Sequence, residues 1–260
     1  MKLEPLLFVV GLLLVHWTHV AFPMPQAGML VAQMPASPTP LVSALPATPA
    51  NLPQLDAAIV EKFHRQAFIL ANNSDRAIVG LVVQWVYSDA GGHPITHNVR
   101  SDSFMQVTSH PVVLPHARLL VAPGAFVNEA NIDKPHIGLS AETMDGRLDK
   151  ATEGASGIAA TIDIIIFDDG TIAGPNTTRF DTELQNRKLA ATVLAKQIRN
   201  AIAKGEDPSI TLTRIMDSAP SRDDTLGTWT LRYARMLSRG HLHGQLEALE
   251  NLPEPPSFHK

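Results

Sequence analysis

The sequence predicts an α+β protein in which an antiparallel β-sandwich is followed by C-terminal helices. Residues 54–177 contain several short β-favouring runs that are separated by turn residues. No stretch with apolar residues at helical spacing lies between these runs. Residues 178–260 instead place apolar side chains at helical spacing. The first 53 residues fit neither pattern, and we expect them to lie outside the folded core.

The chain opens on an apolar segment. Lys2 precedes the run Leu6–Val15, which is apolar apart from one glycine. A basic residue before an apolar run is typical of a signal peptide, and residues 6–22, about 17 in number, also reach the lower limit for a membrane span. We therefore expect residues 1–22 to be a signal peptide or an N-terminal membrane anchor, with membrane contact through residues 6–22. In both cases the remainder is extracytoplasmic, either periplasmic or secreted.

A proline-rich stretch follows the leader. Residues 23–53 contain eight prolines together with many Ala, Ser and Thr residues. Proline fixes φ and lacks an N–H group, so such a stretch favours extended conformers over helix or sheet. We expect residues 23–53 to be a disordered spacer.

Composition narrows the classes of function. The formal net charge is −4; residues 54–177 hold 8 Lys and Arg against 14 Asp and Glu, and residues 178–260 hold 12 against 10. Neither part has the concentrated basic face that nucleic-acid binding requires, so we expect no nucleic-acid partner. The chain contains no cysteine, which excludes disulfides, thiolate catalysis and thiolate-ligated zinc.

The first strands predicted form an antiparallel pair. The runs Arg65–Ala71 and Ala77–Tyr87 are rich in β-favouring residues and are joined by the turn formers Asn72–Asp75. In the second run one alternating set is uniformly large and apolar, and we expect it to face the core. This set consists of Val79, Leu81, Val83, Trp85 and Tyr87. Further strands are expected at residues 103–108 and 118–122.

The longest apolar strand predicted is Ile158–Phe167. It is followed by Asp168-Asp169-Gly170-Thr171, whose Asp-Gly pair is typical of a tight hairpin. The run Asp163–Thr171, then Gly174-Pro175 and an amphipathic helix, resembles a group of exported bacterial proteins with an immunoglobulin-like β-sandwich and no assigned activity. The likeness covers about residues 65–200. It implies an immunoglobulin-like arrangement of the strands and no enzymatic site.

Two main helices are predicted beyond residue 178. Thr178 or Asp181 is a candidate N-cap of the first, which we expect to stop before Gly205. Its predicted apolar face consists of Leu184, Ala191, Leu194, Ile198 and Ile202. A capping box at Ser221 and Asp224 would start the second helix, which ends at Gly240. Its apolar stripe consists of Leu226, Trp229, Tyr233, Met236 and Leu237. Shorter helices are expected at residues 209–217 and 243–251.

The residues that could carry chemistry have simpler structural explanations. His93 and His97 are four residues apart, but a proline between them prevents a common helical face for a metal. The pair Asp168 and Asp169 could serve acid–base catalysis, yet turn chemistry explains it fully. Residues 145–149 lack the alternating ligands of a calcium-binding loop. Residues 154–157, Gly-Ala-Ser-Gly, are one residue shorter than the G-x-S-x-G nucleophile elbow of serine hydrolases. The sequence therefore assigns no catalytic, cofactor-binding or metal-binding residue, and no cofactor.

Three functions remain open at this point. The first is an exported, non-catalytic binding or interaction module of unknown ligand. The alternative is a cell-envelope hydrolase whose site is assembled only in three dimensions, which a cleft that gathers histidines with Asp or Ser would support. The third is an assembly role in which the C-terminal helices dock on a protein partner, which predicts that Trp229 and Tyr233 are exposed.

Overall fold

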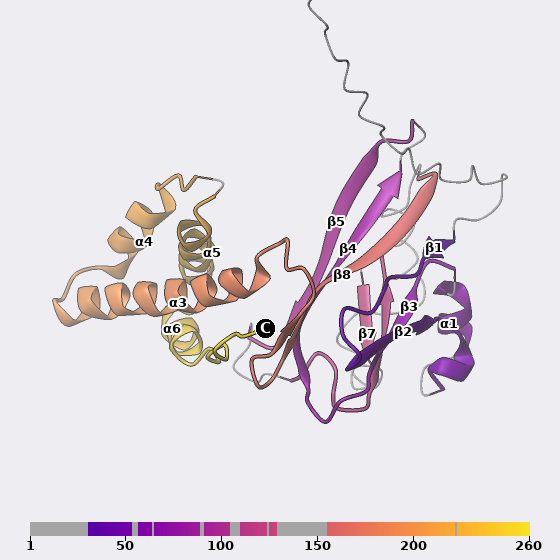
Figure 1. The fold of residues 1–260 in the computed structure, drawn as a ribbon. Coiled ribbons are helices and arrows are strands. Elements are labelled where there is room, and N and C mark those ends of the chain that lie inside the picture. Colours follow the sequence, from indigo (N-terminus) through magenta and orange to yellow (C-terminus); the bar gives the residue numbers. More distant parts are fainter. Residues whose placement is uncertain are drawn as a thin grey trace, which may run out of the picture.

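The protein is a mixed α+β fold in which two β-sheets are followed by a group of helices (Figure 1). The computed structural model describes residues 31–53, 57–63, 65–88, 91–104, 110–123, 125–128, 155–221 and 223–260. The predicted leader, residues 1–22, lies outside the described residues. The α+β class that the sequence predicts is confirmed.

The strands form a five-stranded and a four-stranded sheet. The five-stranded sheet has the order β1-β8-β4-β5, with β9 also paired to β8, and the four-stranded sheet has the order β2-β3-β6-β7. Every pair is antiparallel except β1 with β8. The five-stranded sheet comprises β1 (Ala32–Gln33), β4 (Ile78–Ser88), β5 (Pro94–Asp102), β8 (Gly157–Phe167) and β9 (Ile172–Ala173). The four-stranded sheet comprises β2 (Val42–Pro46), β3 (Phe68–Asn72), β6 (Arg118–Ala122) and β7 (Ala125–Asn128).

One apolar core joins the inner faces of the two sheets. On β4, the large side chains predicted to face inward do so from Leu81 to Tyr87, and they meet side chains of β3 and β6 from the other sheet. The ring centroids of Trp85 and Phe68, one from each sheet, are 6.0 Å apart. Apolar burial of this kind is the main favourable contribution to folding in a chain without disulfides.

At two β-bulges the side chains of β4 and β8 depart from the simple inward–outward alternation that the sequence predicts. The pairing of β4 with β8 shifts between Ile78 and Gly80, so Ile78 joins the inner core while Val79 packs on the outer face of the sheet. The second shift skips Asp163 on β8, because Val82 pairs with Ile164 and the next residue pairs with Ile162. A bulge inserts one residue and reverses the faces beyond it, which simple alternation cannot anticipate.

Helices cover the outer faces of both sheets. The four-stranded sheet is covered by α1 (Ala57–Phe63) through a second apolar cluster, to which Ala47 and Leu52 on either side of the 3-10 helix Pro49–Asn51 also belong. On the five-stranded sheet, Phe180 and Leu184 at the start of α3 (Phe180–Ala203) pack against β4 and β8. Because β3, the first half of β4 and the end of β8 are buried on both faces, they carry apolar residues almost without interruption.

The predicted disordered spacer is wrong for its described part. Within residues 31–53, Val42–Pro46 forms strand β2 and pairs in full register with β3. Val42, Ala47 and Leu52 are buried. Proline is compatible with this position because β2 is an edge strand and Pro46 is its last residue. The β-sheet region therefore begins well before residue 54.

Two other predictions about strands are corrected. The runs around β3 and β4 were expected to pair with each other, but they belong to different sheets, and the turn between them crosses from one sheet to the other. Asn72 fixes this crossing, since its side chain donates to Arg76 O at 2.6 Å and to Leu114 O at 3.1 Å. Strand β5 was not predicted from the sequence. Ser103 and Phe104, at the start of the expected strand 103–108, lie outside any strand.

Four helices form a helical unit beside the sheets, on the left of Figure 1. They are α3 together with α4 (Pro208–Met216), α5 (Thr225–Arg239) and α6 (Leu242–Glu250). Their facing sides bury a common apolar cluster that includes Leu194, Ile198 and Leu246. The predicted helices are thus confirmed, although Ile202 on the expected apolar face is 45% exposed.

The predicted N-caps differ from those in the structure. The residue before α3 is Arg179, which adopts a left-handed conformation with φ of 52°, and Asn176 Oδ1 accepts from Phe180 N at 2.9 Å. Thr178 does not cap α3, because its hydroxyl donates to Asp163. At α5, Asp224 is itself the N-cap and accepts from Gly227 N at 2.8 Å, in place of the expected capping box.

Asp163 joins the β8 bulge to the turn before α3. Its side chain is fully buried and accepts four hydrogen bonds, from the backbone N–H and the hydroxyl of both Thr177 and Thr178, at 2.5–3.1 Å. Burial alone would raise the pKa of this carboxyl, but the hydrogen bonds outweigh burial, and the pKa lies below its ordinary value. The carboxylate is therefore ionised and structural.

The C-terminal tail returns from α6 to the β8–β9 hairpin. His259 N donates to Gly170 O at 3.0 Å, and Ile172 N donates to His259 O at 2.7 Å. Phe258 packs on the outer face of the five-stranded sheet. The tail therefore ties the far end of the helical unit back to the strands, and the predicted hairpin at residues 168–171 is confirmed.

We expect Asp163→Asn to lower the free energy of unfolding by about 2–4 kcal/mol at pH 7, because an amide cannot accept from all four donors. Urea denaturation measures the effect. A carboxyl whose pKa is lowered by folding stabilises the folded state at pH values above its unfolded pKa, which is near 4. This stabilisation is lost as the pH falls through the lower pKa of the folded state. The difference between the two proteins should therefore shrink below about pH 4. Asp169→Asn, at a side chain that is 40% exposed, is the control and should cost less than about 1 kcal/mol.

We expect Gly170→Ala to release the C-terminal tail. At Gly170, φ is +89°, and an added Cβ would lie 2.2 Å from Ser257 O, so the tail must move. Gly92→Ala is a matched control, because its φ is +78° but nothing lies within 4 Å of the added Cβ. Carboxypeptidase digestion should shorten the Gly170→Ala variant faster than both the wild type and Gly92→Ala. Equal rates for the two variants would show that the tail is not held at this hairpin.

Candidate functional site

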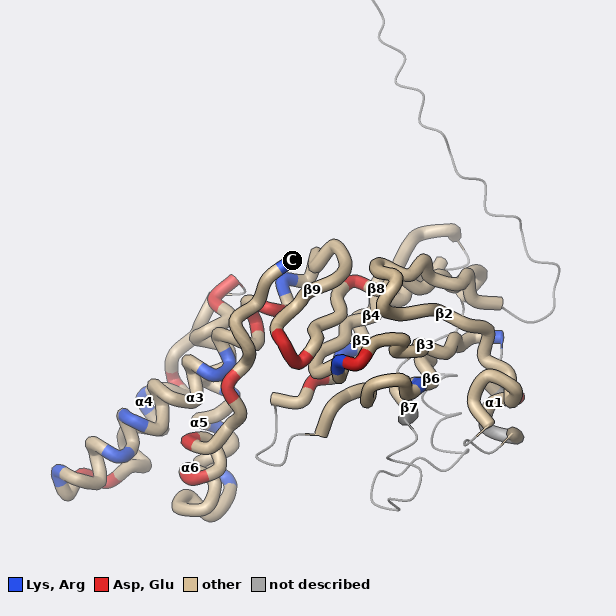
Figure 2. Tube along the Cα trace, turned by 60° about the horizontal axis from the view of Figure 1, so that its bottom comes forward, with Lys and Arg blue, Asp and Glu red and all other residues tan. Residues whose placement is uncertain are grey.

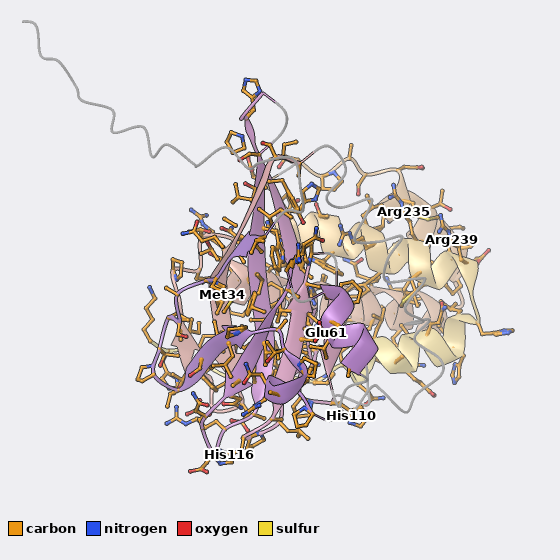
Figure 3. The ribbon with its side chains drawn as sticks, turned by 90° about the vertical axis from the view of Figure 1, so that its right-hand side faces the viewer. Met34, Glu61, His110, His116, Arg235 and Arg239 are labelled. Atoms are coloured by element: carbon orange, nitrogen blue, oxygen red, sulfur yellow. The ribbon has the colours of Figure 1, made fainter. Side chains whose placement is uncertain are left out.

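The candidate residues from the sequence do not come together in the described structure. The described histidines are exposed and lie on several segments, with His93 just before β5 and His97 on it, and Figure 3 shows His110 and His116 at the lower end of the sheets. Within the residues that the structure describes, no group of three or more His, Asp or Glu side chains could hold a metal ion. The calcium-loop candidate, residues 145–149, lies outside the described residues.

The other candidates take structural roles. Asp169 accepts from Thr171 N at 2.9 Å and pairs with Arg76, while Asp168 accepts from Ala77 N at 3.2 Å. These contacts confirm that the two carboxylates stabilise the hairpin and its neighbouring turn. In the imperfect nucleophile elbow, Ser156 donates its hydroxyl to Ser88 O at 3.0 Å, beside the start of β8.

A buried ion network lies where the sheets meet the helical unit. Arg187 of α3 is 6% exposed, and it donates to Asp102 of β5 at 2.7 Å and to Glu183 at 3.2 Å. Glu183 also pairs with Arg100 of β5. The two carboxylate partners offset part of the cost of removing this charge from water, while the Nε atom of Arg187 is buried and makes no hydrogen bond in the described structure. This network connects β5 to α3.

Trp229 extends the network into α5. The guanidinium carbon of Arg187 lies 4.5 Å from the centroid of the Trp229 ring, and that of Arg232 lies 4.6 Å from the same centroid. Cation–π attraction orients both side chains against the indole. The neighbouring Tyr233 is also buried, and burial raises the pKa of its hydroxyl. Trp229 therefore links the buried network to the outer surface of α5.

Arg232 begins a row of three arginines on that surface. Arg232, Arg235 and Arg239 line a shallow pocket of about 460 Å³ between α5 and α6, together with Met236 and Gln245. Their spacing of three and four residues places them on one face of the helix, and the row spans about 10 Å. Figure 3 labels Arg235 and Arg239, which lie on the helical side of the molecule, away from His110 and His116.

The arginines of this pocket, here called the arginine pocket, have no anionic partner among the described residues. All three are exposed, and none of them has a carboxylate within 4.0 Å in the described part of the chain. Figure 2 shows basic and acidic residues distributed along α3–α6, whereas β2 and β3 carry none. The arginine pocket is thus a place where positive charge gathers and is not neutralised within the described chain.

Gln245 of α6 closes one side of the arginine pocket. Its amide lies against Gly240, where an added Cβ would come within 2.1 Å of Nε2 and 2.8 Å of Oε1. Glycine at position 240 therefore leaves the space that the amide occupies. In the described structure the Oε1 atom is buried and accepts no hydrogen bond.

No family model, curated protein or solved structure matches the chain. Within the described residues, no helix combines the length and the apolar composition that are needed to cross a bilayer.

The sequence indicated the arginines but not their role. Basic residues in the last turns of a helix also interact favourably with its C-terminus, so their presence alone does not indicate a ligand site. Their spacing was the available signal, because residues 232, 235 and 239 fall on one helical face. The assembly role predicted that Trp229 and Tyr233 are exposed. Both side chains are instead buried, each 7% exposed, in the core of the helical unit. This finding argues against docking of a protein partner on these two rings.

We expect Arg187→Leu to lower the free energy of unfolding by about 3–5 kcal/mol, because Asp102 would remain buried without its partner. Chemical denaturation followed by Trp fluorescence measures the change. Arg199→Leu is the matched control on the same helix. The side chains of Arg199 and Glu250 are 38% and 34% exposed, so the loss of their ion pair should cost much less than the loss at Arg187. Equal losses for the two variants would contradict a structural role for the buried network.

Proposed function

We propose that this protein is an exported, non-catalytic binding module that takes an anionic ligand in the arginine pocket. The observation that carries the proposal is the row of Arg232, Arg235 and Arg239 around an open pocket, with no carboxylate partner among the described residues. Guanidinium groups are the side chains best suited to bind carboxylates and phosphates, because each presents a planar fork of donors.

The proposal assigns separate tasks to the two parts of the fold. The sheets form an immunoglobulin-like support, which is consistent with two mostly antiparallel sheets that share one core. The helical unit presents the ligand site. Arg187 and the C-terminal tail hold the helical unit against the sheets, and the Trp229 ring holds Arg232 in place. A site on rigid elements loses less conformational entropy when a ligand binds.

Two buried groups with shifted pKa values, Asp163 and Tyr87, are not tuned as a general acid or base. A general acid or base works best with a pKa near the operating pH. Hydrogen bonds hold the pKa of Asp163 below its ordinary value, while burial raises the pKa of Tyr87 to about 12. Both shifts move the pKa further from neutral pH. The alternative of a hydrolase receives no support from the described histidines, which are exposed and dispersed.

Export is part of the proposal and rests on the leader. The apolar run Leu6–Val15 after Lys2 has the composition of a signal peptide or a short anchor. An extracytoplasmic module of this kind would meet anionic groups in solution, on the membrane surface or on envelope polymers. Fractionation of cells that produce the full chain should place the protein outside the cytoplasm.

We expect inorganic phosphate to stabilise the protein through the arginine pocket. A ligand that binds the folded state raises stability by RT ln(1 + [L]/Kd), so the melting temperature should increase with phosphate at constant ionic strength. The double variant Arg235→Gln/Arg239→Gln should lose this increase. Arg214→Gln, which removes an exposed arginine from α4, should retain it.

The proposal fails if phosphate, sulfate and carboxylate anions all leave the melting temperature unchanged. It also fails if the double variant and Arg214→Gln respond as the wild type does, since the anion would then act elsewhere or non-specifically.

A further inference from the structure

The outer edge of β5 is a second surface of this protein that has no partner among the described residues. Strand β5 is the last strand of the five-stranded sheet, and Figure 1 shows its upper half away from the helices. Its nine residues pair with β4 in a regular antiparallel register without a bulge. The opposite edge of β5 therefore presents a straight row of backbone donors and acceptors.

The far side of the same sheet is covered, in contrast. Strand β8 pairs with β1 at one end and with β9 at the other, and between them Asp163 O accepts from Asn176 N at 2.8 Å. The C-terminal tail covers β9, since Ile172 N donates to His259 O at 2.7 Å. Within the described part of the chain, no backbone group on the outer edge of β5 has such a partner.

The upper half of β5 also lacks the usual protection of an edge strand. Natural edge strands carry charged side chains, internal prolines or bulges that prevent pairing with another chain. Residues 94–99 contain no Lys, Arg, Asp or Glu, and the proline among them, Pro94, is the first residue of the strand. Pairing of this edge with a further strand is therefore not opposed by the sequence.

The hydrogen-bond pattern shows which backbone groups point to the open edge. In an antiparallel pair, residues that exchange both bonds alternate with residues whose groups point to the other side. Ser103 N donates to Val79 O at 2.9 Å, one position beyond the last pair of β4 with β5. Odd-numbered residues of β5 thus bond to β4, and the N–H and C=O groups of Thr96, Asn98 and Arg100 point outward.

This edge is complementary to a second copy of itself. A two-fold axis at His97 pairs Thr96 of one copy with Asn98 of the other, so that these residues exchange backbone hydrogen bonds. The same register places Ile95 of one copy opposite Val99 of the other on the inner face of the sheet. Ile95 is 49% exposed, and Val99 packs against the inner core. The pairing therefore buries an apolar side chain that the single chain leaves in water.

Charge and shape are also compatible with this register. Arg100 of each copy falls opposite Pro94 of the other, so no like charges meet, and Arg100 N can donate to Pro94 O. Helix α3 contacts β5 at Asp102, and antiparallel pairing places the two Asp102 positions at opposite ends of the shared strands. The two copies would form about six backbone hydrogen bonds with each other.

We infer that two copies of this chain associate through β5, as a two-fold dimer in which the five-stranded sheets continue into each other. A second copy fits this edge because apolar side chains meet apolar ones across the axis, polar side chains meet polar ones, and no charge is repeated. The surface is separate from the arginine pocket on α5. Since the interface is small, we expect a reversible dimer whose fraction rises with concentration.

Proline at an outward-pointing position tests the contact. Sedimentation velocity of the full chain over a range of concentrations measures the dimer. We expect Asn98→Pro to lower the association constant about tenfold or more, because each copy loses an outward N–H donor while its bonds to β4 are kept. Asn98→Ala, which keeps the N–H group, is the matched control and should dimerise as the wild type does.

Cysteine cross-linking tests the register, and the chain has no cysteine of its own. In His97→Cys the two thiols face each other across the axis with Cα atoms about 4.5 Å apart, so mild oxidation should join the two copies. In Thr96→Cys, the control, the two Cα atoms would lie about 8 Å apart, beyond the reach of a disulfide. Electrophoresis without reductant measures the cross-linked fraction.

Three results would overturn the β5 dimer. They are a wild type that stays monomeric up to its highest soluble concentration, an Asn98→Pro variant that dimerises like the wild type, and a Thr96→Cys variant that cross-links as fast as His97→Cys. A thermal melt establishes that each variant is folded. If Asn98→Pro does not fold, the two cysteine variants decide, because both keep the pairing of β5 with β4.

Discussion

The ion pair between Arg187 and Asp102 is the interaction on which the arrangement of this protein depends. It joins the edge strand β5 to α3, and both side chains are more than nine-tenths buried. Glu183 adds a second carboxylate, and the rings of Phe180 and Trp229 pack against the guanidinium. Removing either partner would leave a charge buried in a region of low polarity, so the helical unit and the sheets are held in one orientation.

The same cation is connected to the candidate site through one aromatic ring. Trp229 contacts the guanidinium groups of both Arg187 and Arg232, and only the second of these lies on the pocket. The two arginines have opposite roles. Arg187 is neutralised by carboxylates inside the fold, whereas Arg232, Arg235 and Arg239 have no carboxylate partner among the described residues. This difference in partners, more than the number of basic residues, suggests where a ligand binds.

The elements with a strong local signal could be predicted from the sequence. Strand β8 is a continuous apolar run that ends in an Asp-Gly turn, and β6 is bounded by turn residues; both were predicted within one residue. The long helices α3 and α5 follow from apolar spacing and glycine stops. These features depend on residues close together in the chain, which is the information that a single sequence contains.

The features that depend on distant residues could not be predicted. Strand β2 is flanked on both sides by turn formers and prolines. It is a strand because it pairs with β3. Strand β5 is polar and exposed, so it lacks the alternation that marks a half-buried strand. The N-terminus of α3 is capped by Asn176 through an unusual left-handed turn, while Thr178 is drawn to Asp163 on β8. For the candidate site, the spacing of the arginines is visible in the sequence, but whether carboxylates of the described residues lie near them depends on how the helices pack.

Titration of the protein with phosphate, followed by NMR of the arginine side-chain Nε–Hε groups, tests the central claim most directly. We expect the signals of Arg232, Arg235 and Arg239 to shift together and saturate, while those of Arg199 and Arg214 stay in place. Shifts of equal size at all exposed arginines, or none at the three on α5, would contradict it.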